Sequence, residues 1–108
     1  MKKVTYEVIL QSQLGPRTGE LMLQEDTQAV SGYLRLLGHR NGFSGRVLEQ
    51  GKYLICGALR SPVNKEPYDA IFTVKDGRLT GGLITSHGCW DLTGVQMVPV
   101  ASRLKNEC

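Results

Sequence analysis

The stretch Val30-Ser31-Gly32-Tyr33-Leu34 contains the pattern that decides the fold: an apolar residue, a small polar residue, glycine, any residue and a second apolar residue. The pattern recurs along the chain, and its central glycines are Gly19, Gly32, Gly45, Gly57, Gly81 and Gly94. Successive glycines lie 13, 13, 12, 24 and 13 residues apart, and Ala70 takes the glycine's place in the middle of the double step. A period of 12 to 13 residues fits one strand plus one turn. With a first unit around Tyr6, the sequence therefore predicts eight strands.

Apolar and polar residues alternate within these units, which is typical of strands with one buried face. We predict strands over residues 3–11, 18–24, 29–37, 43–49, 52–60, 68–75, 78–85 and 89–98. Gln50-Gly51 and Asp76-Gly77 predict tight hairpins, the second with a type I′ turn. Proline and glycine predict longer loops over Ser12 to Arg17, Gly38 to Gly42 and Ser61 to Pro67.

The glycines of the pattern share a face with the apolar residues around them. Inward glycines destabilise a strand, so their repeated use indicates tight curvature and a narrow interior shared with large side chains. The large residues expected inside are Tyr6, Tyr53, Tyr68 and Trp90. These features predict an all-β fold, an eight-stranded antiparallel up-and-down meander closed into a small barrel. The alternative is a sandwich of two sheets with the same strand order.

In architecture the pattern resembles small meander barrels such as the streptavidin and lipocalin groups. None of those families' binding motifs is present, so the resemblance implies a fold and no function.

Length and composition predict one domain over residues 1–108, with residues 100–108 as a frayed tail. The net charge of +3 is spread without a basic or acidic run, which makes nucleic acid an unlikely obligatory partner. No apolar segment is long enough to cross a membrane. Three cysteines at unrelated spacings favour reduced thiols and a cytoplasmic location.

The sequence contains no phosphate-binding loop, dinucleotide fingerprint, metalloprotease helix or nucleophile elbow, and we predict a protein that is not an enzyme and has no cofactor. His87 beside Cys89 lacks the third group that would orient a base, so chance proximity is the preferred interpretation. A zinc site from Cys56, Cys89, His39 and His87 lacks paired ligand spacings, so no metal is expected. Asp69 and Asp91 are predicted to face outward.

The candidate site is the end of the barrel where the longer loops lie, because binding residues concentrate on loops. Its donors and cations, with one aromatic residue, are Arg17, His39, Arg40, Asn41, Asn64, Lys65, His87 and Trp90. The leading hypothesis is a non-enzymatic binding module that holds a small anionic ligand or a peptide at this end.

Two other hypotheses remain open. One is a structural or self-assembling subunit, since outward apolar residues on neighbouring strands favour a homodimer through Leu48, Leu54, Ile71 and Ile84. The other is weak binding of single-stranded nucleic acid through Arg35, Arg46, Arg60 and Tyr33, for which ordinary surface charge is the simpler interpretation.

Overall fold

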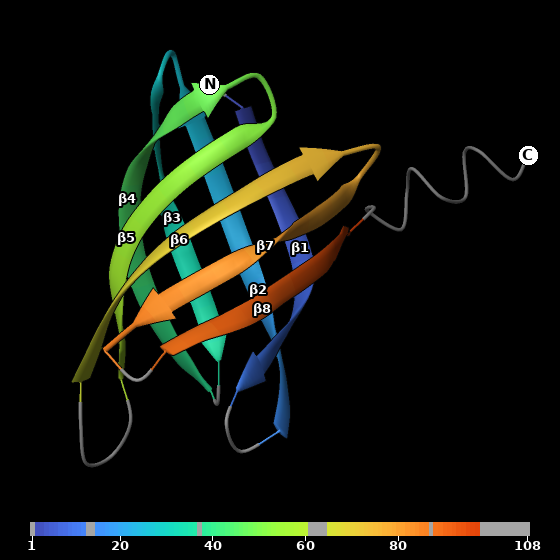
Figure 1. The fold of residues 1–108 in the computed structure, drawn as a ribbon. Coiled ribbons are helices and arrows are strands. Elements are labelled where there is room, and N and C mark those ends of the chain that lie inside the picture. Colours follow the sequence, from blue (N-terminus) through green and yellow to red (C-terminus); the bar gives the residue numbers. More distant parts are fainter. Residues whose placement is uncertain (1, 13–14, 37, 61–64, 87, 98–108) are drawn as a thin grey trace, which may run out of the picture.

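The computed structural model describes residues 2–12, 15–36, 38–60, 65–86 and 88–97, which form a closed antiparallel barrel of eight strands (Figure 1). The strands are β1 (Lys2–Ser12), β2 (Gly15–Asp26), β3 (Ala29–Leu36), β4 (His39–Glu49), β5 (Lys52–Arg60), β6 (Lys65–Lys75), β7 (Arg78–Thr85) and β8 (Gly88–Gln96). Each strand pairs with the next, and β8 pairs with β1. The predicted meander barrel is confirmed and the two-sheet alternative is wrong.

These ranges contain no helix, and hence none long and apolar enough to span a membrane. The segment 100–108, predicted to be a frayed tail, lies outside the described residues.

The barrel interior holds the hydrophobic core that the described residues form, and it is built by the alternation that the sequence shows. Val8, Leu21, Leu34 and Leu83 are fully buried, while their neighbours in the chain face outward or lie half-buried. Tyr6, Tyr53 and Tyr68 are buried, and Trp90 packs partly buried against the same core. The inward face of each strand is therefore the one predicted from its period-two pattern.

The inward glycines mark positions where neighbouring strands approach too closely for a side chain. At Gly32, with φ of +152°, a Cβ atom would overlap the carbonyl oxygen of Met22 in β2. At Gly45 it would overlap the carbonyl oxygen of Leu54 in β5. The glycines thus permit the bends that close the barrel, and the obstacle to a larger residue is the adjacent backbone as well as the filled core.

Three strands begin three or four residues earlier than the sequence predicts. β2, β4 and β6 start at Gly15, His39 and Lys65, inside segments expected to be loops. Their first residues pair on one side only, since β2 meets β3 from Gly19 onward and β6 meets β7 from Asp69 onward. A strand with one free side tolerates proline, so β2 and β6 accommodate Pro16 and Pro67.

One end of the barrel has tight turns at residues 27–28, 50–51 and 76–77, which join β2 to β3, β4 to β5 and β6 to β7. We name it the short-turn end. Asp76 and Gly77 have φ of 53° and 76°, as a type I′ turn requires. In each turn the carbonyl of the second residue accepts a hydrogen bond from the backbone N–H of a residue in the strand that follows the hairpin. Val74 N donates to Gly51 O at 2.7 Å, and Val47 N donates to Gln28 O at 2.8 Å. These bonds fix the turns relative to the barrel wall. We name the other end, where β1 connects to β2, β3 to β4, β5 to β6 and β7 to β8, the long-turn end.

Candidate ligand-binding site

A cavity of about 320 Å³ opens at the short-turn end and extends into the barrel. Its walls come from β1 and β2 on one side and from β5, β6 and the turn between β4 and β5 on the other. The residues that line it are Val4, Tyr6, Leu23, Glu25, Gln50, Gly51, Tyr53 and Val74. The cavity is therefore the mouth of the barrel itself, whereas two further depressions lie on the outer surface around Glu7 and Thr18.

Glu25 brings a carboxylate to this mouth because the inward alternation of β2 continues one step past Leu23. The sequence predicts that this strand ends at residue 24, whereas β2 runs to Asp26 and Glu25 pairs with the buried Val30. The sequence signal for an inward Glu25 is the alternation Leu21, Leu23, Glu25 along one face of the strand. A charged residue at a core-facing position ordinarily indicates the end of a strand, and here the strand continues through it.

The carboxylate of Glu25 is held across the barrel mouth by a tyrosine. The hydroxyl of Tyr53 on β5 donates to Oε1 of Glu25 at 2.8 Å, and its ring packs against Phe72 with centroids 5.4 Å apart. Burial, and then the hydrogen bond to Glu25, raise the pKa of Tyr53 well above its ordinary value. Burial and the charge of Glu25 likewise raise the pKa of Tyr6. Both phenols are thus neutral at physiological pH, where each hydroxyl can donate.

The lining combines apolar walls, one carboxylate, two phenols and one amide side chain. Among the described side chains, the lining holds no cysteine, serine or histidine, so these residues present no nucleophile paired with a base. Across residues 2–12, 15–36, 38–60, 65–86 and 88–97, no three His, Cys, Asp or Glu side chains gather as metal ligands would.

Residues predicted for the site at the long-turn end are divided between the two faces of the barrel. Arg17 and His39 lie opposite Leu10 and Leu36, whose side chains are buried, so both positions belong to the inner face. Trp90 also faces inward and is half-buried. These three positions retain the geometry that the hypothesis requires.

Asn41 faces inward too, but it is only 3% exposed and its amide is occupied by the backbone. Its nitrogen donates to the carbonyls of Leu34 at 3.1 Å and His39 at 3.2 Å. Its oxygen accepts from the backbone N–H of Arg60 at 3.0 Å. Both amide hydrogens are used, so the side chain links three strands instead of presenting donors to a ligand.

Arg40 and Lys65 are exposed on the outer face, where Arg40 lies opposite Arg35 and Lys65 opposite Arg60. The guanidinium carbon of Arg40 stands 4.6 Å from the ring centroid of Tyr33. Asn64 and His87 lie outside the described residues. The predicted cluster is therefore not one group around one opening.

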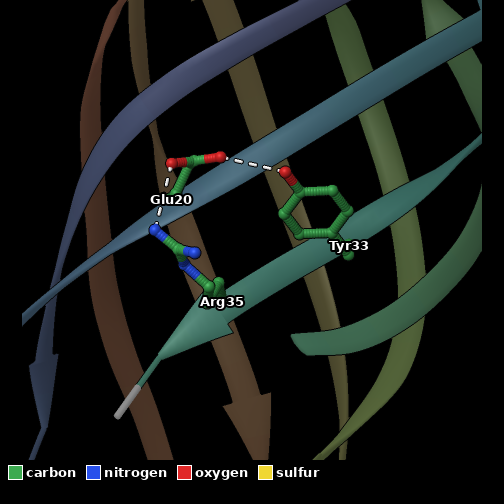
Figure 2. A network of polar contacts seen from close by, with 3 residues as sticks. All are labelled: Glu20, Tyr33 and Arg35. Carbon is green, nitrogen blue, oxygen red and sulfur yellow. Dashed lines mark hydrogen bonds and ion pairs between the residues drawn. The ribbon is translucent and has the colours of Figure 1, made fainter. Parts of the chain in front are cut away.

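The outer face of β2 and β3 carries a polar network instead of a free stacking surface (Figure 2). Tyr33 donates from its hydroxyl to Oε1 of Glu20 at 2.9 Å, and Arg35 forms an ion pair with Oε2 of Glu20 at 3.5 Å. With Arg40 over its ring, Tyr33 is engaged at its hydroxyl and at one ring face. The exposed Arg46 and Arg60 remain as the other members of the predicted nucleic-acid surface.

Apolar side chains face outward on β4 to β7, as predicted. Leu48, Ile71 and Ile84 are 39%, 40% and 47% exposed, and Leu54 is half-buried beside Ile71. Cys56 lies on the same face, where a hydrogen bond to Asp69, and then burial, raise the pKa of its thiol. A raised pKa lowers the reactive thiolate fraction. Self-association through this face stays a prediction.

Comparison with solved structures shows the fold and no family. A redesigned beta barrel, mFAP1, bound to DFHBI, is similar with a TM-score of 0.65 and 16% identity, over 87% of this chain and 92% of that chain. A second redesigned beta barrel has a TM-score of 0.60 and 16% identity, over 88% and 89% of the two chains. The Pseudomonas fluorescens agglutinin has a TM-score of 0.37 and 15% identity, over 84% and 98%, which is too distant to support an argument. No protein-family model matches the sequence, and no curated sequence is similar to it.

Proposed function

We propose that this protein is a non-enzymatic binding module that holds a small molecule in the cavity at the short-turn end. The observation that carries the proposal is the cavity itself, an opening of about 320 Å³ at one end of a barrel whose described core residues are packed together. Its size falls at the lower end of the range for ligand pockets, about 300 to 1,000 Å³. Apolar walls with a few fixed polar groups are also typical of such pockets.

Two further features support this function. The cavity is preorganised by two hydrogen bonds in its wall. The backbone N–H of Val74 donates to the carbonyl of Gly51, and the hydroxyl of Tyr53 donates to the carboxylate of Glu25. In addition, mFAP1, a redesigned barrel of similar fold, carries the small molecule DFHBI in its structure. A barrel of this kind can thus accommodate a small ligand.

The ligand then lies at the opposite end of the barrel from the one that the loop residues of the sequence favour. The alternative site is the long-turn end, which would hold an anionic ligand or a peptide with Arg17, His39 and Trp90 on its inner face. The short-turn end is preferred because the cavity and its fixed polar groups are there. At the long-turn end, the amide of Asn41 is hydrogen-bonded to the backbone, and Arg40 and Lys65 lie on the outer face.

The test is a fragment screen by ligand-detected NMR, followed by mapping of hits onto the assigned backbone amides. We expect shifts concentrated at Val4, Tyr6, Gly51, Tyr53 and Val74. Val74→Trp fills the cavity and should abolish these shifts, whereas Thr73→Trp, on the exposed face of the same strand, should leave them unchanged. Hits that map around Arg17 and Trp90 would transfer the site to the long-turn end, and the absence of any mapped hit would favour a structural subunit.

A further inference from the structure

A row of four positive charges crosses the outer wall of the barrel near the long-turn end, and we name it the basic row. Arg35 on β3 lies directly opposite Arg40 on β4, and Arg60 on β5 lies directly opposite Lys65 on β6. The two pairs adjoin, because the backbone N–H of Arg60 donates to the side chain of Asn41, the residue after Arg40. All four cations are exposed. Since like charges in directly opposite positions repel, a bound anion would relieve an unfavourable interaction of the free chain.

The protein supplies little negative charge to the basic row. Glu20 lies opposite Arg35 on β2 and forms an ion pair with it at 3.5 Å. Arg40 and Arg60 form no ion pair with any described residue. Residues 37 and 61–64, which adjoin these strands outside the described ranges, include no acidic residue in the sequence. The two central arginines therefore lack a carboxylate partner from this part of the chain.

Other acidic residues lie away from the row. On β6, Glu66 accepts hydrogen bonds from Ser86, and Asp69 is four residues along the strand from Lys65. Glu107 is outside the described residues, in a segment that follows β8, and β8 is on the far side of the barrel from β4. The outer wall of β3 to β6 thus keeps an excess of positive charge at this end.

The row is short and has a defined limit. Beyond Arg35 it continues into Glu20 and Glu7, which lie opposite each other on β2 and β1. Neighbouring strands are about 4.8 Å apart, so the four cations span about 14 Å of the wall. In an extended peptide, every second side chain lies on one face at intervals of about 7 Å, so three carboxylates of such a peptide match this length. A longer polyanion that follows the row would meet the two glutamates.

The aromatic residue beside the row offers bases a poor stacking surface. The hydroxyl of Tyr33 donates to Glu20 (Figure 2), and the guanidinium of Arg40 covers one face of its ring. Proteins that bind single-stranded nucleic acid combine phosphate contacts with stacking on aromatic side chains. Guanidinium groups pair with carboxylates through two parallel hydrogen bonds and need no such stacking. These features favour a carboxylate partner over nucleic acid.

We propose that the basic row is a docking surface for a short acidic segment of another protein, bound in an extended conformation. Its carboxylates pair with Arg40 and Arg60, and Arg35 and Lys65 flank them. This surface is distinct from the cavity at the short-turn end, so the inference goes beyond the proposed function and does not depend on it. It is also distinct from the mouth of the long-turn end, because its cations face away from the barrel interior.

The probe is a peptide of alternating glutamate and serine with blocked ends and three carboxylates, titrated into the full chain at low ionic strength. Dissociation constants are taken from amide shifts, which we expect at Arg35, Arg40, Gly42, Ala58 and Arg60. The same peptide with glutamine in place of glutamate should bind at least about tenfold more weakly, since it can form no ion pair. Added salt should weaken the acidic peptide, because exposed charges are screened.

Variants assign the binding to the row. The double variant Arg40→Gln with Arg60→Gln should weaken the acidic peptide about tenfold, as the loss of two exposed ion pairs implies. The matched control is Arg46→Gln with Arg78→Gln, which changes the net charge equally at exposed outer positions outside the row. This control should change the affinity by less than about twofold. Val74→Trp, which fills the cavity, should leave peptide binding unchanged.

Several results would overturn the inference. They are a failure of the acidic peptide to bind, equal binding of the glutamine peptide, and equal weakening in the two double variants. Shifts concentrated around Arg17 and Trp90 would place the peptide in the mouth of the barrel instead. A thymidine tetranucleotide carries the same number of charges as the peptide. If it binds more tightly and is weakened by Arg40→Gln with Arg60→Gln, the partner is nucleic acid and the peptide class is wrong. None of these results bears on the cavity at the short-turn end.

Discussion

The side-chain oxygen of Asn41 accepts a hydrogen bond from the backbone N–H of Arg60 at 3.0 Å, where β4 and β5 are no longer paired directly. The ladder between these strands starts only at Phe43 and Gly57. The nitrogen of the same amide donates to Leu34 of β3 and to His39 of β4. One buried side chain thus takes the place of missing ladder bonds at the long-turn end.

Replacement of Asn41 by leucine should destabilise the barrel. The substitution leaves two carbonyl groups and one N–H without this partner in a largely buried place, and one such group costs about 1–3 kcal/mol. We expect a loss of at least about 2 kcal/mol in the free energy of unfolding, measured by urea titration. His39→Leu, at the exposed neighbouring position, should change it by less than about 0.5 kcal/mol. Equal losses in both variants would show that the amide bonds are not the cause.

A substitution of Gly32 tests whether the glycine pattern determines closure. In Gly32→Ala the new Cβ would overlap the carbonyl of Met22, and φ of +152° is unfavourable for alanine. We expect a loss clearly above the average of about 1 kcal/mol for a point mutation. Gly82→Ala is the control, since the nearest atom to its Cβ would be 3.7 Å away. It should be neutral or stabilising, and a similar loss in the control would contradict the argument.

The fold could be predicted from the sequence because a 12-to-13-residue period and a period of two act together. Each glycine marks a strand and each alternation indicates its inner face, so Tyr6 and Tyr53 of the cavity wall are correctly predicted to lie inside. The site could not be predicted, because a cavity depends on how far Tyr6, Tyr53 and Val74 fill a shared volume. The inward position of Glu25 could not be predicted either. A charged residue on an inner face ordinarily indicates the end of a strand, and its hydrogen-bond partner Tyr53 is known only from the structure.

Outward apolar residues on β6 and β7 predict concentration-dependent self-association. Ile71 and Ile84 are 40% and 47% exposed on adjacent strands, a surface that a second copy would bury. Light scattering should show a dimer, and Ile71→Lys should shift it toward monomer. Val95→Lys, which changes an exposed residue of β8, should leave the dimer intact. A wild-type protein that stays monomeric at high concentration would contradict the prediction.

Two inward tyrosines should respond oppositely to loss of the hydroxyl. Tyr68 is buried and its hydroxyl has no hydrogen-bond partner among the described residues, whereas the hydroxyl of Tyr53 donates to Glu25. Tyr68→Phe should therefore leave the free energy of unfolding unchanged or raise it by about 1 kcal/mol, since an unpaired buried hydroxyl is unfavourable. Tyr53→Phe should lower it by about 1–2 kcal/mol. A large loss in Tyr68→Phe would indicate a bound water or another partner at that hydroxyl.

The inward tyrosines also predict loss of stability at alkaline pH. Burial raises the pKa of Tyr6, Tyr53 and Tyr68 in the folded protein above the ordinary value of 10.0, so the unfolded chain loses these protons first. Stability from this source is complete below about pH 10 and falls as the pH rises above it, because the folded state then holds more protons than the unfolded state. Urea titrations between about pH 8 and about pH 11 should show this decrease. Tyr68→Phe removes one of the three groups and should make the decrease less steep. A stability that does not change across this range would mean that the phenols ionise as readily in the barrel as in the unfolded chain.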